Sequence, residues 1–144
     1  GRGFLQSVPI MYCCDNSLGM SLVRVMASGA ISTYDLLRHS VNVATDDQVP
    51  AQYRLCFEIL PEAVLSEITW HDIKMLVQVE NMSAKNVGAM GAFVASAQSV
   101  YRQVRALLAA YRPTRSQVRL FPERAAALDW LTVGQASTQR VNFA

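Results

Sequence analysis

The chain has 144 residues, a hydrophobic fraction of 51%, a charged fraction of 17% and a formal net charge of +2. A chain of this length can bury about 70% of its unfolded surface in one domain, and this composition excludes an intrinsically disordered protein. No apolar run approaches the roughly 20 residues that cross a bilayer, so we expect a soluble protein.

The first predicted element is a β-hairpin. Residues 8–14 and 18–27 are strand-like runs, and the segment 15–17 between them (Asp-Asn-Ser) favours a turn because its side chains bond to the nearby backbone. Residues 1–7 carry one Arg and lack the apolar core of a signal peptide. We expect them to be disordered or an artificial remnant ahead of the domain.

A helix over residues 33–45 is predicted next. Ser32 and Thr33 can cap its start, and Asp35 in the first turn favours the helix dipole. The apolar residues expected on its buried side are Leu36, Leu37, Val41 and Ala44.

The predicted fold is centred on an inner strand that leads into a helix. Residues 54–60 form an apolar run that ends at Pro61, with Cys56 expected on one face and Leu55, Phe57 and Ile59 on the other.

The following helix begins near Thr69, which can form a capping box with Asp72. Its residues at helical spacing are Ile73, Leu76, Val77 and Glu80, apolar except for the last. The loop 62–68 lies at the carboxyl end of the strand, where open α/β sheets bind their ligands.

Two further strand and helix pairs are predicted. Residues 87–96 and 117–121 are strand-like, residues 96–111 form an amphipathic helix, and residues 123–131 form a short final helix before a flexible tail over 132–144. The apolar stripe of the amphipathic helix is Val100, Val104, Leu107, Leu108 and Tyr111. The predicted order is ββαβαβαβα in one α/β domain over residues 8–131.

Three stretches support a family resemblance. They are residues 29–37 (Gly-Ala-Ile-Ser-Thr-Tyr-Asp-Leu-Leu), 68–73 (Ile-Thr-Trp-His-Asp-Ile) and 118–131, which ends on Ala-Leu-Asp-Trp-Leu. With the element order, they resemble the SpoIIAA-like branch of the STAS family, the sulfate-transporter and anti-sigma-factor-antagonist domains. The resemblance implies a STAS-like mixed sheet of about five strands with about four helices, and activity by binding rather than by turnover.

The start of the second helix is the first candidate site. The resemblance implies that members similar to the classical antagonist are switched by phosphorylation of a Ser that follows an Asp there. This chain has Ile68-Thr69-Trp70 instead, with no Asp before the hydroxyl. The candidates for a phosphoacceptor or partner site are Ser66, Thr69 and His71, and the simpler interpretation of Thr69 is a helix cap.

A cleft between the second and third helices is the second candidate. Other relatives look like lipid-carrier domains, and methionine suits adaptable apolar pockets. The expected cleft residues are Met75, Met82, Met90, Phe93, Tyr101 and Leu108, with ordinary core packing as the alternative.

Cations gather in the last third of the chain, where residues 100–144 hold seven Arg against two acidic residues. A docking face for anionic lipid or an acidic partner is one interpretation, and a solvated helix face is the other. The candidate docking residues are Arg102, Arg105, Arg112 and Arg115, followed by Arg119 and Arg124. We expect no nucleic-acid binding, since no aromatic-rich basic strand or recognition helix is evident.

Catalytic and metal-binding motifs are not evident. His39 and His71 lack Cys or carboxylate partners at ligand spacing, and no nucleotide-binding, phosphate-loop or nucleophile-elbow motif occurs, so we expect no metal, no cofactor and no enzyme activity. Three Cys, two of them adjacent at 13 and 14, do not indicate a disulfide framework and favour a reducing, cytoplasmic location.

Two functional hypotheses follow. The first is a regulatory module that binds a partner protein through the amino end of the second helix and the loop before it. The alternative is an apolar-ligand or lipid-binding module that associates with a membrane surface. Homodimerisation through a sheet edge or the opening hairpin is a further expectation, because the strand near Met20 to Met26 is expected to be an exposed edge strand that is apolar on both faces.

Overall fold

The structure is a computed structural model that describes residues 8–86, 89–111 and 117–132. The elements in chain order are β1 (Ile10–Asp15), β2 (Leu22–Ala27), α1 (Thr33–Thr45), β3 (Arg54–Ile59), α2 (Trp70–Glu80), the 3-10 turn η2 (Ala84–Asn86), β4 (Met90–Ala95), α3 (Gln98–Leu108) and β5 (Gln117–Phe121). A C-terminal helix over residues 124–132 follows β5. The predicted order ββαβαβαβα is confirmed.

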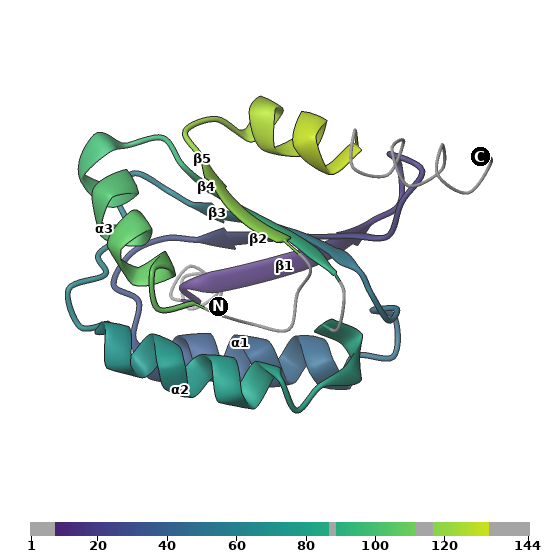
Figure 1. Cartoon of the computed structure of the whole chain (residues 1–144), viewed down its shortest axis with the longest axis horizontal. Coiled ribbons are helices and arrows are strands. Elements are labelled where there is room, and N and C mark those ends of the chain that lie inside the picture. The colour runs from purple at the N-terminus through teal and green to yellow at the C-terminus, as the bar shows by residue number, and fades with distance from the viewer. Residues whose placement is uncertain (1–7, 87–88, 112–116, 133–144) are drawn as a thin grey trace, which may run out of the picture.

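The strands form one mixed sheet in the order β1-β2-β3-β4-β5. β1 pairs with β2 in the antiparallel sense, as the predicted hairpin requires, and β2 to β5 are parallel to one another. Helices α1, α2 and α3 lie on one side of the sheet and the C-terminal helix lies on the other (Figure 1). The sheet is therefore the middle layer of three.

The inner strand β3 provides both faces of the sheet with buried side chains. Leu55, Phe57 and Ile59 belong to the core under α1 to α3, and Cys56 belongs to the core under the C-terminal helix. This alternation confirms the prediction made from residues 54–60, and it follows from the two-residue period of a strand.

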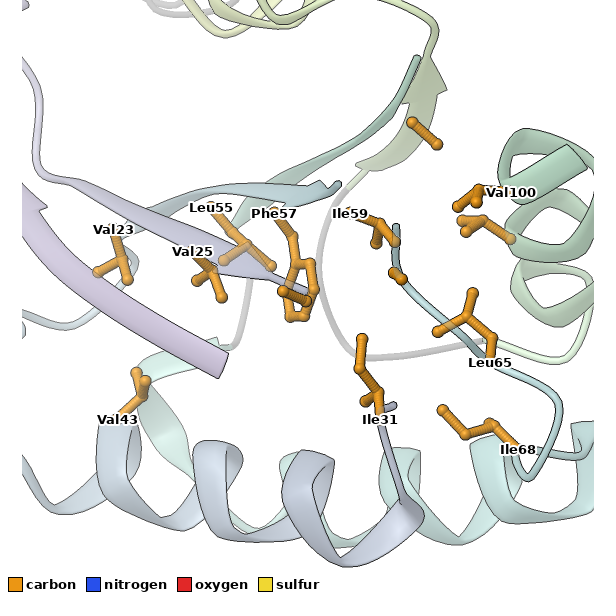
Figure 2. Packing of buried hydrophobic residues seen from close by; sticks show 14 of the residues in the cluster. Val23, Val25, Ile31, Val43, Leu55, Phe57, Ile59, Leu65, Ile68 and Val100 are labelled. Carbon is orange, nitrogen blue, oxygen red and sulfur yellow. The ribbon is translucent and has the colours of Figure 1, made fainter. Parts of the chain in front are cut away.

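The larger core lies between the sheet and the three helices. Figure 2 shows Val25 and Phe57 pointing from the sheet toward the helix layer, in which Val43 of α1 lies near one end and Val100 of α3 near the other. Ile31 and Ile68 pack into this core from the segments that precede α1 and α2.

The C-terminal helix covers the second core and is held by polar residues of β3. Arg54 donates a hydrogen bond to the carbonyl oxygen of Leu131, and Arg124 Nε lies 2.9 Å from Glu58 Oε1. The buried residues that these contacts enclose are Met20, Leu22, Cys56, Ala92, Val94, Phe121, Ala127 and Leu131.

Two expectations about faces and edges were wrong. Val41, predicted on the buried side of α1, is 50% exposed, whereas Val43 is 4% exposed. The buried face of α1 is rotated by about one residue relative to the predicted face, so His39 and Ser40 point inward. The segment from Met20 to Met26 is not an edge, because β2 is paired with β1 on one side and with β3 on the other.

Candidate functional site

A cavity of about 110 Å³ lies between the sheet and the three helices of the larger core. The sheet contributes Leu55, Phe57 and Phe93 to its wall, and the helices contribute Leu76 of α2 and Val104 of α3, among other apolar side chains. The cavity is therefore bounded mainly by hydrocarbon and aromatic surface.

A row of aromatic rings follows this wall. His39 meets Phe57 edge to face with ring centroids 5.7 Å apart, Phe57 stacks on Phe93 at 5.4 Å, and Phe93 meets Tyr111 edge to face at 5.6 Å. Tyr12 approaches the other side of His39 at 5.7 Å. His39, Phe57, Phe93 and Tyr111 all line the cavity, which gives it surfaces suited to a flat ring.

His39 is the one histidine of the larger core among the described residues. Burial lowers the pKa of its imidazole to about 4, so the ring is neutral at pH 7. A neutral imidazole offers one hydrogen-bond donor and one acceptor. His39 lies between Leu36 and Val43 at helical spacing, and this spacing was the sequence signal that could have placed it inside.

Polar side chains mark another part of the cavity. Glu80 accepts hydrogen bonds from the Tyr111 hydroxyl at 2.6 Å and from Ser40 Oγ at 3.4 Å. Lys85 Nζ donates to the carbonyl oxygen of Asp46 at 2.7 Å. These cavity-lining groups are half-buried, so they lie where the cavity approaches solvent and could admit one polar group of a ligand.

The predicted methionine cleft and the observed cavity share two residues, Phe93 and Leu108. Tyr101 packs against the larger core without lining the cavity. Met75 and Met82 are 42% and 85% exposed, and Met90 packs against the second core on the opposite face of the sheet. The methionine residues predicted a cleft between the second and third helices, but the observed helix and strand geometry turns these three side chains away from the cavity.

The start of α2 is occupied by its own capping box. The backbone amide of Asp72 donates to Thr69 Oγ1 at 3.2 Å, and Asp72 Oδ2 accepts from the Thr69 amide at 2.9 Å and from its hydroxyl at 3.0 Å. These hydrogen bonds lower the pKa of Asp72, to which Thr33 of α1 also contributes. A phosphate on Thr69 would meet the Asp72 carboxylate. Ser66 and His71 are exposed nearby.

Exposed apolar side chains surround this helix start. Tyr34, Trp70 and Val64 are 68%, 57% and 50% exposed. They sit on neighbouring segments, because the Val64 amide donates to the carbonyl oxygen of Gly29 at 2.8 Å and Val64 forms a parallel bridge with Ala30 just before α1. We call this group the Tyr34–Val64–Trp70 surface, and contiguous exposed apolar side chains of this kind can mark sites of protein–protein contact.

The Arg candidates do not form one face in the described residues. Arg102 and Arg105 are exposed on α3, and Arg112 and Arg115 lie outside the described residues. Arg119 stacks over Phe121 at 5.2 Å, and Arg124 pairs with Glu58. Arg119 therefore contacts the second core, and Arg124 contacts β3.

The part of the chain that the structure describes has neither a metal-binding cluster nor a membrane-spanning helix. It contains no group of three or more His, Cys, Asp and Glu side chains that could hold a metal ion. None of its helices combines the length and the apolar character needed to cross a bilayer. Cys13, Cys14 and Cys56 are free thiols.

Comparison with known proteins gives a match at the level of structure. No protein-family model and no curated protein matches the sequence. Among solved structures, an uncharacterized protein of the DUF3478 family from Shewanella loihica PV-4, with a SpoIIAA-like fold, superposes with a TM-score of 0.52 at 15% sequence identity. The match covers 85% of this chain and 93% of that one. The chain therefore has the SpoIIAA-like fold that the sequence resemblance predicted.

Proposed function

We propose that this protein is a non-enzymatic, cytoplasmic module that binds a small apolar ligand in the cavity beneath α1, α2 and α3. The observation that carries the proposal is the cavity of about 110 Å³ with aromatic and aliphatic walls. The cavity opens partly to solvent, and concave sites with mainly apolar walls and a few polar groups are typical of small-molecule binding. The free thiols of the described chain support a reducing compartment.

The size of the cavity limits the ligand. An engineered apolar cavity of about 150 Å³ in a lysozyme holds benzene, so a volume of about 110 Å³ suits a single ring with few substituents. A long acyl chain would require the helices to separate from the sheet. The proposal therefore favours a compact ligand over a membrane lipid.

The polar groups of the cavity support binding rather than catalysis. Glu80 accepts two hydrogen bonds from the protein, and the Lys85 ammonium donates to a backbone carbonyl. An activated nucleophile needs a base within about 2.6–3.2 Å, whereas Ser40 Oγ lies 3.4 Å from Glu80 Oε2. The contacts made by Glu80 and Lys85 instead hold α1, α2 and the segment after α3 around the cavity.

Titration with toluene tests the proposal directly. We expect toluene to shift the methyl resonances of cavity residues in a saturable manner and to raise the melting temperature. Val104→Phe places a ring in the cavity and should abolish toluene binding while the fold is kept. Gln103→Phe adds the same ring at an exposed position of the same helix and should leave binding intact. Failure of the wild-type protein to bind toluene and related single-ring compounds would refute the proposal.

A second candidate function is supported by the Tyr34–Val64–Trp70 surface. We propose that a partner protein with an apolar contact patch binds there, because exposed aromatic side chains beside the start of α2 are typical of interaction hot spots. This is the region that the sequence also indicated.

The control for this candidate is another exposed residue of the same region of the chain. Met82, just after α2, is 85% exposed and lies at the opposite end of that helix. A partner captured by the wild-type protein and by Met82→Ala, but lost from Trp70→Ala, would support the candidate. Equal capture by all three proteins would contradict it.

A further inference from the structure

The side chain of His39 is a largely buried polar group with no hydrogen-bond partner in the described part of the chain. Its ring contacts are the edges and faces of Tyr12 and Phe57, at centroid distances of 5.7 Å each. The large majority of buried side-chain polar atoms in native proteins have a hydrogen-bond partner, either in the protein or in ordered water. The imidazole of His39 lines the cavity without a partner in the described part of the protein, so its ring nitrogens are available to pair with a molecule that enters the cavity.

The surroundings of His39 limit the charge of that molecule. Desolvation lowers the pKa of His39 and keeps the ring uncharged at neutral pH, so it offers no opposite charge to an anion. The other ionisable side chains that line the cavity are Tyr53, Glu80, Lys85 and Tyr111, with Glu80 and Lys85 bonded to other parts of the protein. A charged ligand group beside His39 would lose its hydration without compensation.

The neighbouring rings limit its shape. Phe57 presents its ring edge to face against His39 and stacks on Phe93, so the space beside the imidazole is bounded by flat aromatic surfaces. Aromatic groups pack on such surfaces in offset-stacked or edge-to-face geometry. A hydroxyl can donate and accept, and it therefore matches either tautomer of a neutral imidazole.

We infer that the ligand is a small uncharged aromatic molecule with a hydroxyl group that hydrogen-bonds to His39. This inference rests on the proposed function, because it assigns the chemistry of the molecule that fills the same cavity. It makes His39 a specificity-determining residue, and it distinguishes a phenol-like ligand from a hydrocarbon of equal size.

Phenol and toluene form the test pair, since they differ by a hydroxyl in place of a methyl group. Dissociation constants of both compounds are measured with the wild-type protein and with His39→Phe, which removes the ring nitrogens and keeps an aromatic ring. We expect the affinity for phenol relative to toluene to fall about five- to tenfold in the variant, as is typical of one lost hydrogen bond. An unchanged ratio would overturn the inference.

The chain's two histidines provide a second readout that needs no variant. In protein labelled with nitrogen-15 at histidine, phenol should shift the imidazole nitrogen resonances of His39 and leave those of the exposed His71 in place, whereas toluene should shift neither set strongly. Unmoved His39 resonances at saturating phenol would overturn the inference even if His39→Phe failed to fold. If toluene binds but His39 makes no contribution to phenol binding, the inference fails and the proposed function stands. If neither compound binds, the inference and the proposed function are both refuted.

Discussion

Acidification should destabilise this protein through His39. Burial lowers the pKa of His39 from its ordinary value of 6.5 to about 4 in the folded state. The unfolded chain therefore binds the proton more tightly, and it is favoured wherever the folded ring must stay neutral. The contribution of the neutral His39 ring to the free energy of unfolding is complete above about pH 7. It is lost as the pH drops from about 6.5 to about 4.

The size of the effect follows from the two pKa values. Between about pH 7.5 and about pH 5, proton linkage for a group with pKa about 4 when folded and about 6.5 when unfolded removes about 2 kcal/mol from the free energy of unfolding. Urea denaturation at both pH values should show this loss in the wild-type protein. His39→Phe cannot bind the proton, so its loss should be smaller by about the same 2 kcal/mol.

The neighbouring titratable groups do not produce this difference. Burial raises the pKa of Tyr12, which contacts the His39 ring, to about 12, so this phenol stays neutral in the range tested. Hydrogen bonds hold the pKa of Asp46 and of Asp72 below 3.8, so these carboxylates lose their contribution only at lower pH. Equal losses in the wild-type protein and in His39→Phe would refute the reasoning, because they would mean that the imidazole is hydrated in the folded state.

Three further substitutions test the scaffold, each by urea denaturation. Leu131→Ala removes a fully buried side chain of the C-terminal helix and should cost about 2–5 kcal/mol; a loss below about 1 kcal/mol would mean that this helix is not firmly packed. Thr69→Ala should cost about 1 kcal/mol because it removes the α2 cap, and Thr69→Ser should retain most of the stability, so equal losses would count against the capping role. Arg124→Ala should cost less than about 1 kcal/mol, as expected for a solvent-exposed pair with Glu58, and a much larger loss would show that this pair anchors the helix.

The sequence predicted the element order because its strongest signals are local. The Thr69 and Asp72 capping box begins α2 as expected, and the alternation along β3 needs no knowledge of the partner strands. The buried stripe predicted for the second helix ends on Glu80, and the stripe predicted for the helix over residues 96–111 ends on Tyr111. These two residues meet at the cavity, so their unusual polarity on apolar stripes was already a signal of the site.

The cavity itself could not be predicted in the same way. A void depends on how helices from distant parts of the chain settle on the sheet, and no local pattern records that distance. Methionine content indicated a pocket at Met75 and Met82, but both side chains point to solvent. His39 was not among the predicted cavity residues, because the buried side predicted for this helix was made of apolar residues alone, whereas the observed cavity wall includes it.

The order of the strands has a consequence for how the protein is made. Each strand lies beside the one that precedes it in the chain, so a nascent polypeptide can extend the sheet one strand at a time as it leaves the ribosome. The C-terminal helix emerges after all five strands and closes the side of the sheet that holds Cys56 and Phe121. Chains stalled before residue 124 should therefore bind chaperones and be cleaved by added protease, whereas released chains that contain this helix should resist both.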